Sequence, residues 1–247
     1  MSTGNKTVIV TGVSNGIGFA IANACLKRGY NVVGHARTPE RLRVAARPGT
    51  PDRFVFLVGD ISKPATLRDC STRRSRASVR SDILINNANV FVARWMVDYT
   101  NEDMENMVDT SLRGFIYPSR KAAKYMSATR HRHIVNITAS GLIRPDINVP
   151  AFFPSRITGG IHHATRSLAV ELAPHNVKVN AVAPALVNPS LQATGTLDSF
   201  KGLPSRDPIG TVEQIVDAVL YLTESEFVTG MVIPADGVPL PEPVVEV

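Results

Sequence analysis

Apolar runs of strand length alternate with stretches of helical period along almost the whole chain. Seven runs rich in Val and Ile predict strands, and six stretches with helical spacing of apolar residues predict helices. The predicted strands are Thr7–Gly12, Asn31–Ala36, Phe54–Asp60, Asp82–Ala88, His133–Thr138, Val177–Pro184 and Gly230–Gly237. The predicted helices are Ile17–Arg28, Pro39–Ala46, Pro64–Arg74, Asn101–Arg130, Gly159–Leu172 and Val212–Glu224.

Strands that alternate with helices in this way indicate βαβ units, whose parallel sheet is covered on both faces. The 247 residues are enough for one sizeable core, and no linker or repeat divides them. We therefore predict an α/β fold: a single doubly wound Rossmann-type domain over residues 1–247, with a seven-stranded, mostly parallel sheet. The Pro-spaced residues 238–247 are expected to form an extended tail.

Composition narrows the class of protein further. Two cysteines, Cys25 and Cys70, are too few for a disulfide framework, and no apolar segment approaches the length of a membrane span. The net charge of +6 comes partly from two arginine-rich stretches without interleaved aromatic residues, which argues against nucleic-acid binding. We expect a cytoplasmic protein that binds neither nucleic acid nor membrane, and whose positive field favours phosphorylated small molecules.

A glycine-rich turn follows the first predicted strand directly and opens the first predicted helix. It reads TGVSNGIG over residues 11–18. Gly12 suits the tight turn, Gly16 lets the backbone approach a diphosphate, and Gly18 lets the helix pack closely on the sheet. The N–H groups at the start of that helix then face the phosphates.

These motifs, together with several others, resemble the short-chain dehydrogenase/reductase family over nearly the whole chain. TGVSNGIG resembles the family's TGxxxGIG, and residues 86–89, which read NNAN, resemble its NNAG turn. Residues 159–187 resemble the family's long helix and sixth strand, and residues 228–237 its last strand. The resemblance implies an oxidoreductase that uses a nicotinamide cofactor.

The resemblance and the glycine turn together give a set of expected cofactor-binding residues. NAD-preferring relatives carry an acidic residue after the second strand, where this chain has Arg37, whose guanidinium suits a 2′-phosphate. NADP(H) is therefore expected in preference to NAD(H), with the neighbouring His35 a spectator. The expected cofactor-binding residues are Gly12, Ser14, Asn15, Gly16, Ile17, Gly18, Arg37, Asp60, Ile61, Asn87, Ala88, Pro184 and Val187.

The family's catalytic tetrad of Asn, Ser, Tyr and Lys is degenerate here. Counting along the motifs puts Ser111 at the Asn position and Ala139 at the Ser position, with Ser140 beside it. If Phe152 and Arg156 stand at the Tyr and Lys positions, the phenyl ring cannot donate a proton and the guanidinium stays charged at ordinary pH. The proton relay that the family places beside the nicotinamide is therefore predicted to be absent.

Two placements of the Tyr and Lys positions remain open. Aligned from the left, AFFPSR resembles the family's AYGPSK, so that Phe152 and Arg156 take these positions and two extra residues follow early in the helix. Aligned from the right, Pro154 and Thr158 take them. We favour the first placement, and both placements lose the phenol and the amine.

Three functions are compatible with this pattern. The first is an NADP(H)-dependent oxidoreductase that reduces an activated acceptor, such as an iminium or an activated carbonyl. The second is a non-redox catalyst of cyclase, isomerase or lyase type, in which Arg144 and Asp146 of the loop over the site act on a substrate. The third is a catalytically silent cofactor-binding subunit. No metal site is predicted.

A small-molecule substrate and a homodimer or homotetramer are the expected partners. In the family the helices that correspond to Asn101–Arg130 and Gly159–Leu172 form a dimer contact. Five apolar positions are candidates either for that contact or for the core: Ile116, Met126, Ile161, Leu168 and Leu172.

Overall fold

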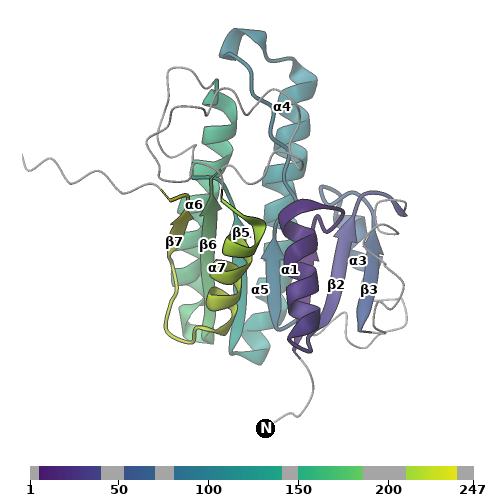
Figure 1. Ribbon diagram of the computed structural model, residues 1–247, viewed down its shortest axis with the longest axis vertical. Coiled ribbons are helices and arrows are strands. Elements are labelled where there is room, and N and C mark those ends of the chain that lie inside the picture. Colours follow the sequence, from purple (N-terminus) through teal and green to yellow (C-terminus); the bar gives the residue numbers. More distant parts are fainter. Residues whose placement is uncertain (1–5, 40–52, 70–80, 141–149, 186–209, 238–247) are drawn as a thin grey trace, which may run out of the picture.

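The computed structural model describes residues 6–39, 53–69, 81–140, 150–185 and 210–237, and these form one sheet with helices on both faces (Figure 1). The strand order is β3-β2-β1-β4-β5-β6-β7, and every neighbouring pair is parallel. The strands are β1 (Thr7–Thr11), β2 (Asn31–Ala36), β3 (Phe54–Val58), β4 (Ile83–Asn86), β5 (Arg132–Ile137), β6 (Val177–Pro184) and β7 (Val232–Ala235). The predicted fold class and all seven strands are confirmed.

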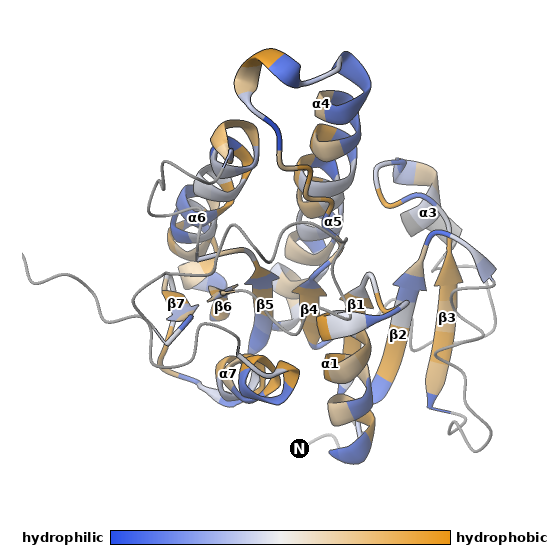
Figure 2. Cartoon of the chain, turned by 45° about the horizontal axis from the view of Figure 1, so that its top comes forward, coloured by the Kyte–Doolittle hydropathy of each residue, from blue (hydrophilic) through white to orange (hydrophobic). Residues whose placement is uncertain are grey.

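The helices separate into two layers, with α4, α5 and α6 on one face of the sheet and α1 and α7 on the other (Figure 2). The longer helices are α1 (Gly16–Lys27), α4 (Asn101–Met107), α5 (Gly114–Thr129), α6 (Phe152–Leu172) and α7 (Val212–Glu224). Shorter ones are α3 (Pro64–Asp69), η1 (Met96–Asp98), the π-helical η2 (Val108–Arg113) and η3 (Ala173–His175). None of the helices in these segments is long and apolar enough to cross a membrane.

Each layer buries its own apolar cluster against the sheet. One cluster joins α1 and α7 to the central strands through residues such as Ile21, Val219 and Val10. The other joins α5 and α6 to the opposite face through Met126 and Leu172. Burial of both faces explains why the strands read as nearly continuous apolar runs rather than as alternating ones.

Two predicted helices differ from the structure in an informative way. The prediction for Asn101–Arg130 missed the π-helical turn η2 between α4 and α5, which no propensity signals. The prediction for Gly159–Leu172 began too late, because α6 starts at Phe152. Pro154 lies in the first turn of α6, where a missing N–H costs no helical hydrogen bond. Residues 40–52 and 70–80 lie outside the described structure, so the predicted helix Pro39–Ala46 and the end of Pro64–Arg74 cannot be compared.

Of the five candidate apolar positions, three belong to the interior. Met126, Ile161 and Leu172 are buried, whereas the side chain of Ile116 is 43% exposed on α5.

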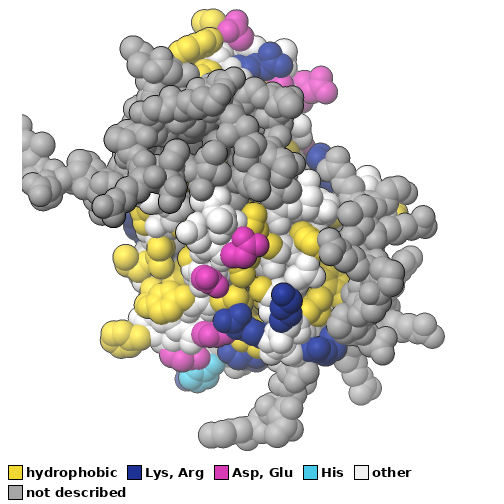
Figure 3. All heavy atoms as spheres, viewed as in Figure 1, with side chains coloured by type: hydrophobic (Ala, Val, Ile, Leu, Met, Phe, Trp, Pro, Cys, Tyr) yellow, Lys and Arg dark blue, Asp and Glu magenta, His cyan; other side chains and the backbone are white. Residues whose placement is uncertain are grey.

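On the opposite face of the molecule, charged side chains of both signs lie beside one another low over α1 and α7 (Figure 3), where Arg28 pairs with Glu224 at 2.9 Å.

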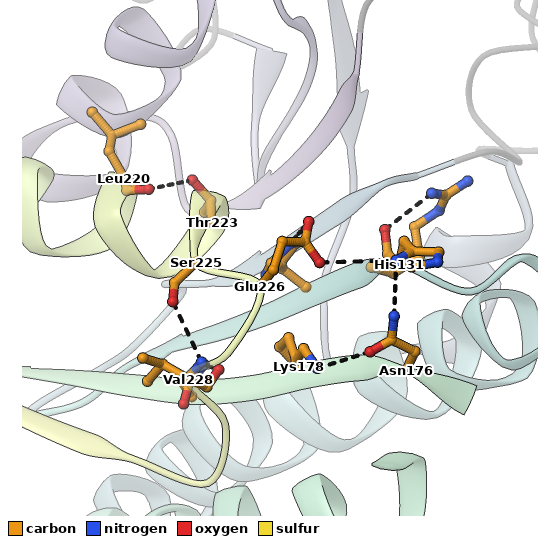
Figure 4. Close-up of polar contacts among 11 residues, drawn as sticks. His131, Asn176, Lys178, Leu220, Thr223, Ser225, Glu226 and Val228 are labelled. Atoms are coloured by element: carbon orange, nitrogen blue, oxygen red, sulfur yellow. Dashed lines mark hydrogen bonds and ion pairs between the residues drawn. The ribbon is translucent and has the colours of Figure 1, made fainter. Parts of the chain in front are cut away.

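A polar cluster ties the amino ends of β5 and β6 to the segment after α7 (Figure 4). Asn176 Nδ2 lies 2.8 Å from His131 Nδ1, and Lys178 Nζ donates to Asn176 Oδ1 at 2.8 Å. Glu226 faces two imidazoles, His131 at 3.8 Å and the buried His133 at 4.0 Å. Burial lowers the pKa of His133 to about 4, and although Glu226 raises that pKa, Lys6 and Lys178 lower it further.

We expect the free energy of unfolding to fall as the pH drops from about 6.5 towards 4. The folded-state pKa of His133 lies below its ordinary value, so the unfolded chain takes up the proton first and acid favours unfolding. At about 1.4 kcal/mol per pH unit, His133 accounts for about 2 kcal/mol between pH 6.5 and pH 5. Urea unfolding of the wild type and of His133→Gln at both pH values measures this loss.

The variant is expected to lose less stability on acidification than the wild type. His163→Gln, which changes an exposed histidine of α6, is the control and keeps the wild-type slope. Equal slopes for the wild type and His133→Gln would show that His133 does not carry the acid sensitivity.

Candidate active site

A pocket of about 310 Å³ opens at the carboxyl ends of the central strands. It lies where the strand order reverses, because β2 lies on one side of β1 and β4 on the other. Open α/β sheets bind ligands at such a point. The lining residues are Gly12, Ser14, Asn15, Gly16, Ile17, Gly18, His35, Ala36, Arg37, Ile61, Asn87, Ala88, Asn89 and Thr110.

The glycine turn that forms the floor of this pocket needs glycine at each position. Gly12 and Gly16 have φ of +74° and +59°, in the left-handed region that favours glycine. A Cβ on Gly12 would lie 2.9 Å from Ala88 Cα. A Cβ on Gly18 would lie 2.3 Å both from Gly12 O and from Asn87 Nδ2.

The N-terminus of α1 points its free N–H groups at the pocket. Its N-cap, Asn15, makes no side-chain capping hydrogen bond, and its first turn contains no acidic residue. Unpaired N–H groups and the positive end of the helix dipole favour an anion there. This end of α1 can therefore hold a diphosphate.

Asn87, at the end of β4, holds the glycine turn in place. Its Nδ2 donates to Thr11 O at 2.9 Å and to Gly12 O at 3.1 Å. The backbone N–H groups of Asn87 and Ala88 both donate to Thr11 Oγ1 at 2.9 Å. The turn is thus fixed before any ligand arrives.

His35 and Arg37, at the end of β2, line the opposite end of the pocket. His35 is 1% exposed, and its Nε2 donates to Gly59 O at 2.8 Å. Burial lowers the pKa of His35, and this lowering outweighs the opposite effects of the Gly59 hydrogen bond and of Asp60. His35 lines the pocket and Arg37 is exposed at the rim, and the expectation that His35 is a spectator stays a prediction.

Asp60 and Pro184 are absent from the pocket lining. Asp60 Oδ1 instead accepts a hydrogen bond from the Ser62 backbone N–H at 2.9 Å. Desolvation raises the pKa of Asp60, but the hydrogen bonds from Ser62 and the charges of Lys63 and Arg37 outweigh it and lower the pKa overall. Its place as a cofactor ligand stays a prediction, and Val187 lies outside the described residues.

The structure places the two polar tetrad positions differently. Ser111 lies on η2, is buried, and donates from Oγ to Asn89 Oδ1 at 2.5 Å. Ala139 follows β5 and presents only a methyl group. Ser140 is buried, and its backbone N–H donates to Pro184 O at 2.8 Å. Arg144 and Asp146 lie outside the described residues.

The start of α6 bears on the two placements of the Tyr and Lys positions. Phe152 is 48% exposed, Arg156 is exposed, and the guanidinium carbon of Arg156 lies 5.3 Å from the centre of the Phe152 ring. Pro154 and Thr158 are buried on the face of α6 that turns towards the sheet. The first placement requires two extra residues early in the helix, but α6 runs without interruption from 152 to 172.

A buried polar network between α6 and β5 fixes which face of α6 turns towards the sheet. Asn136 Nδ2 on β5 donates to Thr165 Oγ1 at 2.9 Å, and Asn136 Oδ1 accepts from Asn86 Nδ2 at 2.9 Å. One turn earlier in α6, His162 Nε2 lies 2.7 Å from Thr138 Oγ1. Burial and the charge of Arg166 lower the pKa of His162.

Fold and pocket together define a dinucleotide-binding protein of the doubly wound class. The family model that matches, over residues 6–198, is described as short chain dehydrogenase. The chain therefore belongs to the short-chain dehydrogenase family and is an oxidoreductase of that family. Members of this family use nicotinamide cofactors.

Relatives of known name and structure agree with this assignment. The 3-oxoacyl-acyl-carrier-protein reductase FabG of Buchnera aphidicola subsp. Schizaphis graminum is 28% identical over 96% of this chain and 98% of its own. A solved short chain dehydrogenase/reductase family protein is 28% identical over 96% of this chain and 99% of its own, with a TM-score of 0.83. The structure titled ElxO with NADP bound shares the fold, with a TM-score of 0.83 at 23% identity over 95% of this chain and 98% of its own.

Proposed function

We propose that this protein is an NADP(H)-dependent reductase that delivers hydride to an activated acceptor without the family's tyrosine–lysine proton relay. The observation that carries the proposal is the contrast between the two parts of the site. The glycine turn, the N-terminus of α1 and Arg37 line a pocket suited to the adenosine and diphosphate part of a dinucleotide. Neither placement of the catalytic positions on α6, by contrast, contains a Tyr or a Lys.

The 2′-phosphate is assigned to the β2 end of the pocket. Arg37 stands at the rim there, and its planar guanidinium makes paired hydrogen bonds with phosphate oxygens. No Asp or Glu is among the described residues that line the pocket, so no carboxylate there repels a phosphate. A ribose hydroxyl can accept only a weaker hydrogen bond from Arg37 than a phosphate dianion does, which favours NADP(H) over NAD(H).

We also propose that Pro154 and Thr158, rather than Phe152 and Arg156, occupy the Tyr and Lys positions. In α6 the buried stripe that contains Thr165 and His162 continues to Thr158 and Pro154, one turn at a time. Phe152 and Arg156 lie about 200° away from Pro154 around the helix, at 100° per residue. They belong to the outer face.

A site of this kind suits an acceptor that needs little acid catalysis. A proton relay contributes roughly 10²–10⁴-fold in rate to ordinary carbonyl reduction. An iminium already carries the positive charge that a carbonyl gains only on protonation, so hydride transfer to its carbon needs orientation more than a proton donor. The nicotinamide supplies the hydride when it is bound, and the protein supplies its placement.

Installing the missing pair tests both the placement and the loss of the relay. Pro154→Tyr with Thr158→Lys is expected to raise the rate of ketone reduction by about 10²-fold or more, the scale of a restored proton relay. NADPH oxidation is measured by absorbance with a neutral ketone as acceptor.

Phe152→Tyr with Arg156→Lys is the matched control, since the same two side chains then stand on the outer face of α6. This control is expected to gain no activity. A gain in the control variant alone would return the Tyr and Lys positions to Phe152 and Arg156.

We further propose that the protein is a cytoplasmic homodimer or homotetramer. Ile116 on α5 and Val170 on α6 expose apolar side chains on the outer helical layer, where a second copy can cover them. Cys25 is a buried free thiol, as expected in a reducing compartment.

A further inference from the structure

Asn89 brings a side chain to a point of the pocket where the family motif has only a glycine hydrogen. It follows β4 by three residues, lines the pocket and is exposed. Its carboxamide is therefore available to a ligand. Neither the diphosphate site nor Arg37 accounts for its presence.

Ser111 fixes the orientation of this carboxamide. The Val90 backbone N–H donates to Ser111 Oγ at 3.1 Å, so the serine proton is directed to an acceptor. The shortest contact is with Asn89 Oδ1 at 2.5 Å, and Val90 O lies farther away at 3.2 Å. Because Oδ1 faces Ser111, the Nδ2 group of Asn89 is turned away from it, and Nδ2 makes no hydrogen bond with the other residues that the structure describes.

The topology shows which half of a dinucleotide meets this group. The diphosphate belongs at the N-terminus of α1, directly after β1, and the 2′-phosphate belongs at Arg37, after β2. Since β2 and β4 lie on opposite sides of β1, the second nucleoside extends to the β4 side, where Asn89 stands. The first group it presents there is the ribose that carries the nicotinamide.

We propose that Asn89 Nδ2 donates a hydrogen bond to a hydroxyl of the nicotinamide-side ribose, and that Ser111 is the positioning residue that aims it. This inference rests on the proposed function. A ribose hydroxyl there needs a hydrogen-bond donor, and neither Pro154 nor Thr158, at the proposed Tyr and Lys positions, carries an amine. Asn89 supplies that donor. Ser111 is only 5% exposed, so its hydroxyl is held firmly in place.

The test compares two ligands on the same proteins. NADPH contains both riboses, whereas adenosine 2′,5′-bisphosphate contains only the adenosine half with its 2′-phosphate. Dissociation constants are measured by calorimetry for the wild type, Asn89→Gly and Ser111→Ala. Asn101→Ala, which changes an exposed asparagine on α4 outside the pocket lining, is the control.

Asn89→Gly is expected to weaken NADPH binding about fivefold to tenfold, the worth of one hydrogen bond, and to leave binding of the bisphosphate unchanged. Ser111→Ala is expected to weaken NADPH binding about threefold with the same selectivity. A general loss of folding would weaken both ligands alike.

Unchanged NADPH binding in Asn89→Gly, or an equal loss for both ligands, would overturn the inference. Failure of the proposed function has a different signature: the wild type would bind both ligands but would not oxidise NADPH with an iminium acceptor. The Asn89 inference, which is measured by binding, would survive that result.

Discussion

Gly18→Ala is expected to abolish measurable NADPH binding, with a rise in the dissociation constant of at least about 100-fold, or roughly 3 kcal/mol. The added methyl group would lie 2.3 Å from Gly12 O, a backbone atom that cannot move without opening the glycine turn. It would lie equally close to Asn87 Nδ2, whose displacement breaks the hydrogen bonds to Thr11 O and Gly12 O. Calorimetric titration with NADPH measures the effect.

The same clash is expected to lower the free energy of unfolding by about 1–3 kcal/mol, the usual cost of forcing an atom into a packed site. The variant must therefore be titrated where it remains folded, as judged by circular dichroism. Gly160→Ala is the matched control. Nothing lies within 4 Å of a Cβ at Gly160, inside α6, so this change is expected to leave NADPH binding intact and to stabilise the helix slightly. Normal NADPH affinity in folded Gly18→Ala would show that the cofactor binds elsewhere.

Arg37→Ser is expected to weaken NADPH binding about 10- to 100-fold and to change NADH binding by less than about twofold. A hydrogen bond between a guanidinium and a phosphate is worth about 1.5–3 kcal/mol, and only NADPH carries the 2′-phosphate that receives it. The preference for NADPH over NADH should shrink by the same factor. Dissociation constants for both cofactors, measured at one salt concentration, give this ratio directly.

Arg120→Ser removes the same charge from α5, away from the pocket lining, and serves as the control for long-range electrostatics. It is expected to affect both cofactors equally and slightly. If Arg37→Ser weakens NADH and NADPH to the same extent, Arg37 acts through the general positive field and does not recognise the 2′-phosphate.

The phosphate end of the site could be predicted from the sequence because its signals are local. The glycines at 12, 16 and 18 lie within one turn, and the flanking strand and helix follow from their apolar patterns. Ten of the thirteen expected cofactor-binding residues line the pocket, all of them near this turn or at the carboxyl ends of β2, β3 and β4. Their positions follow once the strand order is known.

The residues that sequence reasoning missed depend on contacts between distant segments. His35 reaches the pocket because of the register of β2 with β1, where it pairs with Thr11. Asn89 lines the pocket, and its carboxamide oxygen accepts a hydrogen bond from Ser111, 22 residues later. Two adjacent glycines, Gly159 and Gly160, read as a helix start, although α6 continues through them. Because the predicted helix began at Gly159, it could not indicate that Pro154 is buried and Phe152 exposed at the start of α6.

The most direct test of the central claim compares NADPH oxidation with two acceptors on the wild-type protein. One is a cyclic iminium, and the other is acetoacetyl-coenzyme A, whose uncharged keto group belongs to a 3-oxoacyl thioester, the acyl type named for the Buchnera relative. A working cofactor pocket without a proton relay predicts turnover of the iminium and a ketone rate lower by about 10²-fold or more. Ketone reduction as fast as iminium reduction would contradict the account, because it would require an acid–base pair beside the nicotinamide.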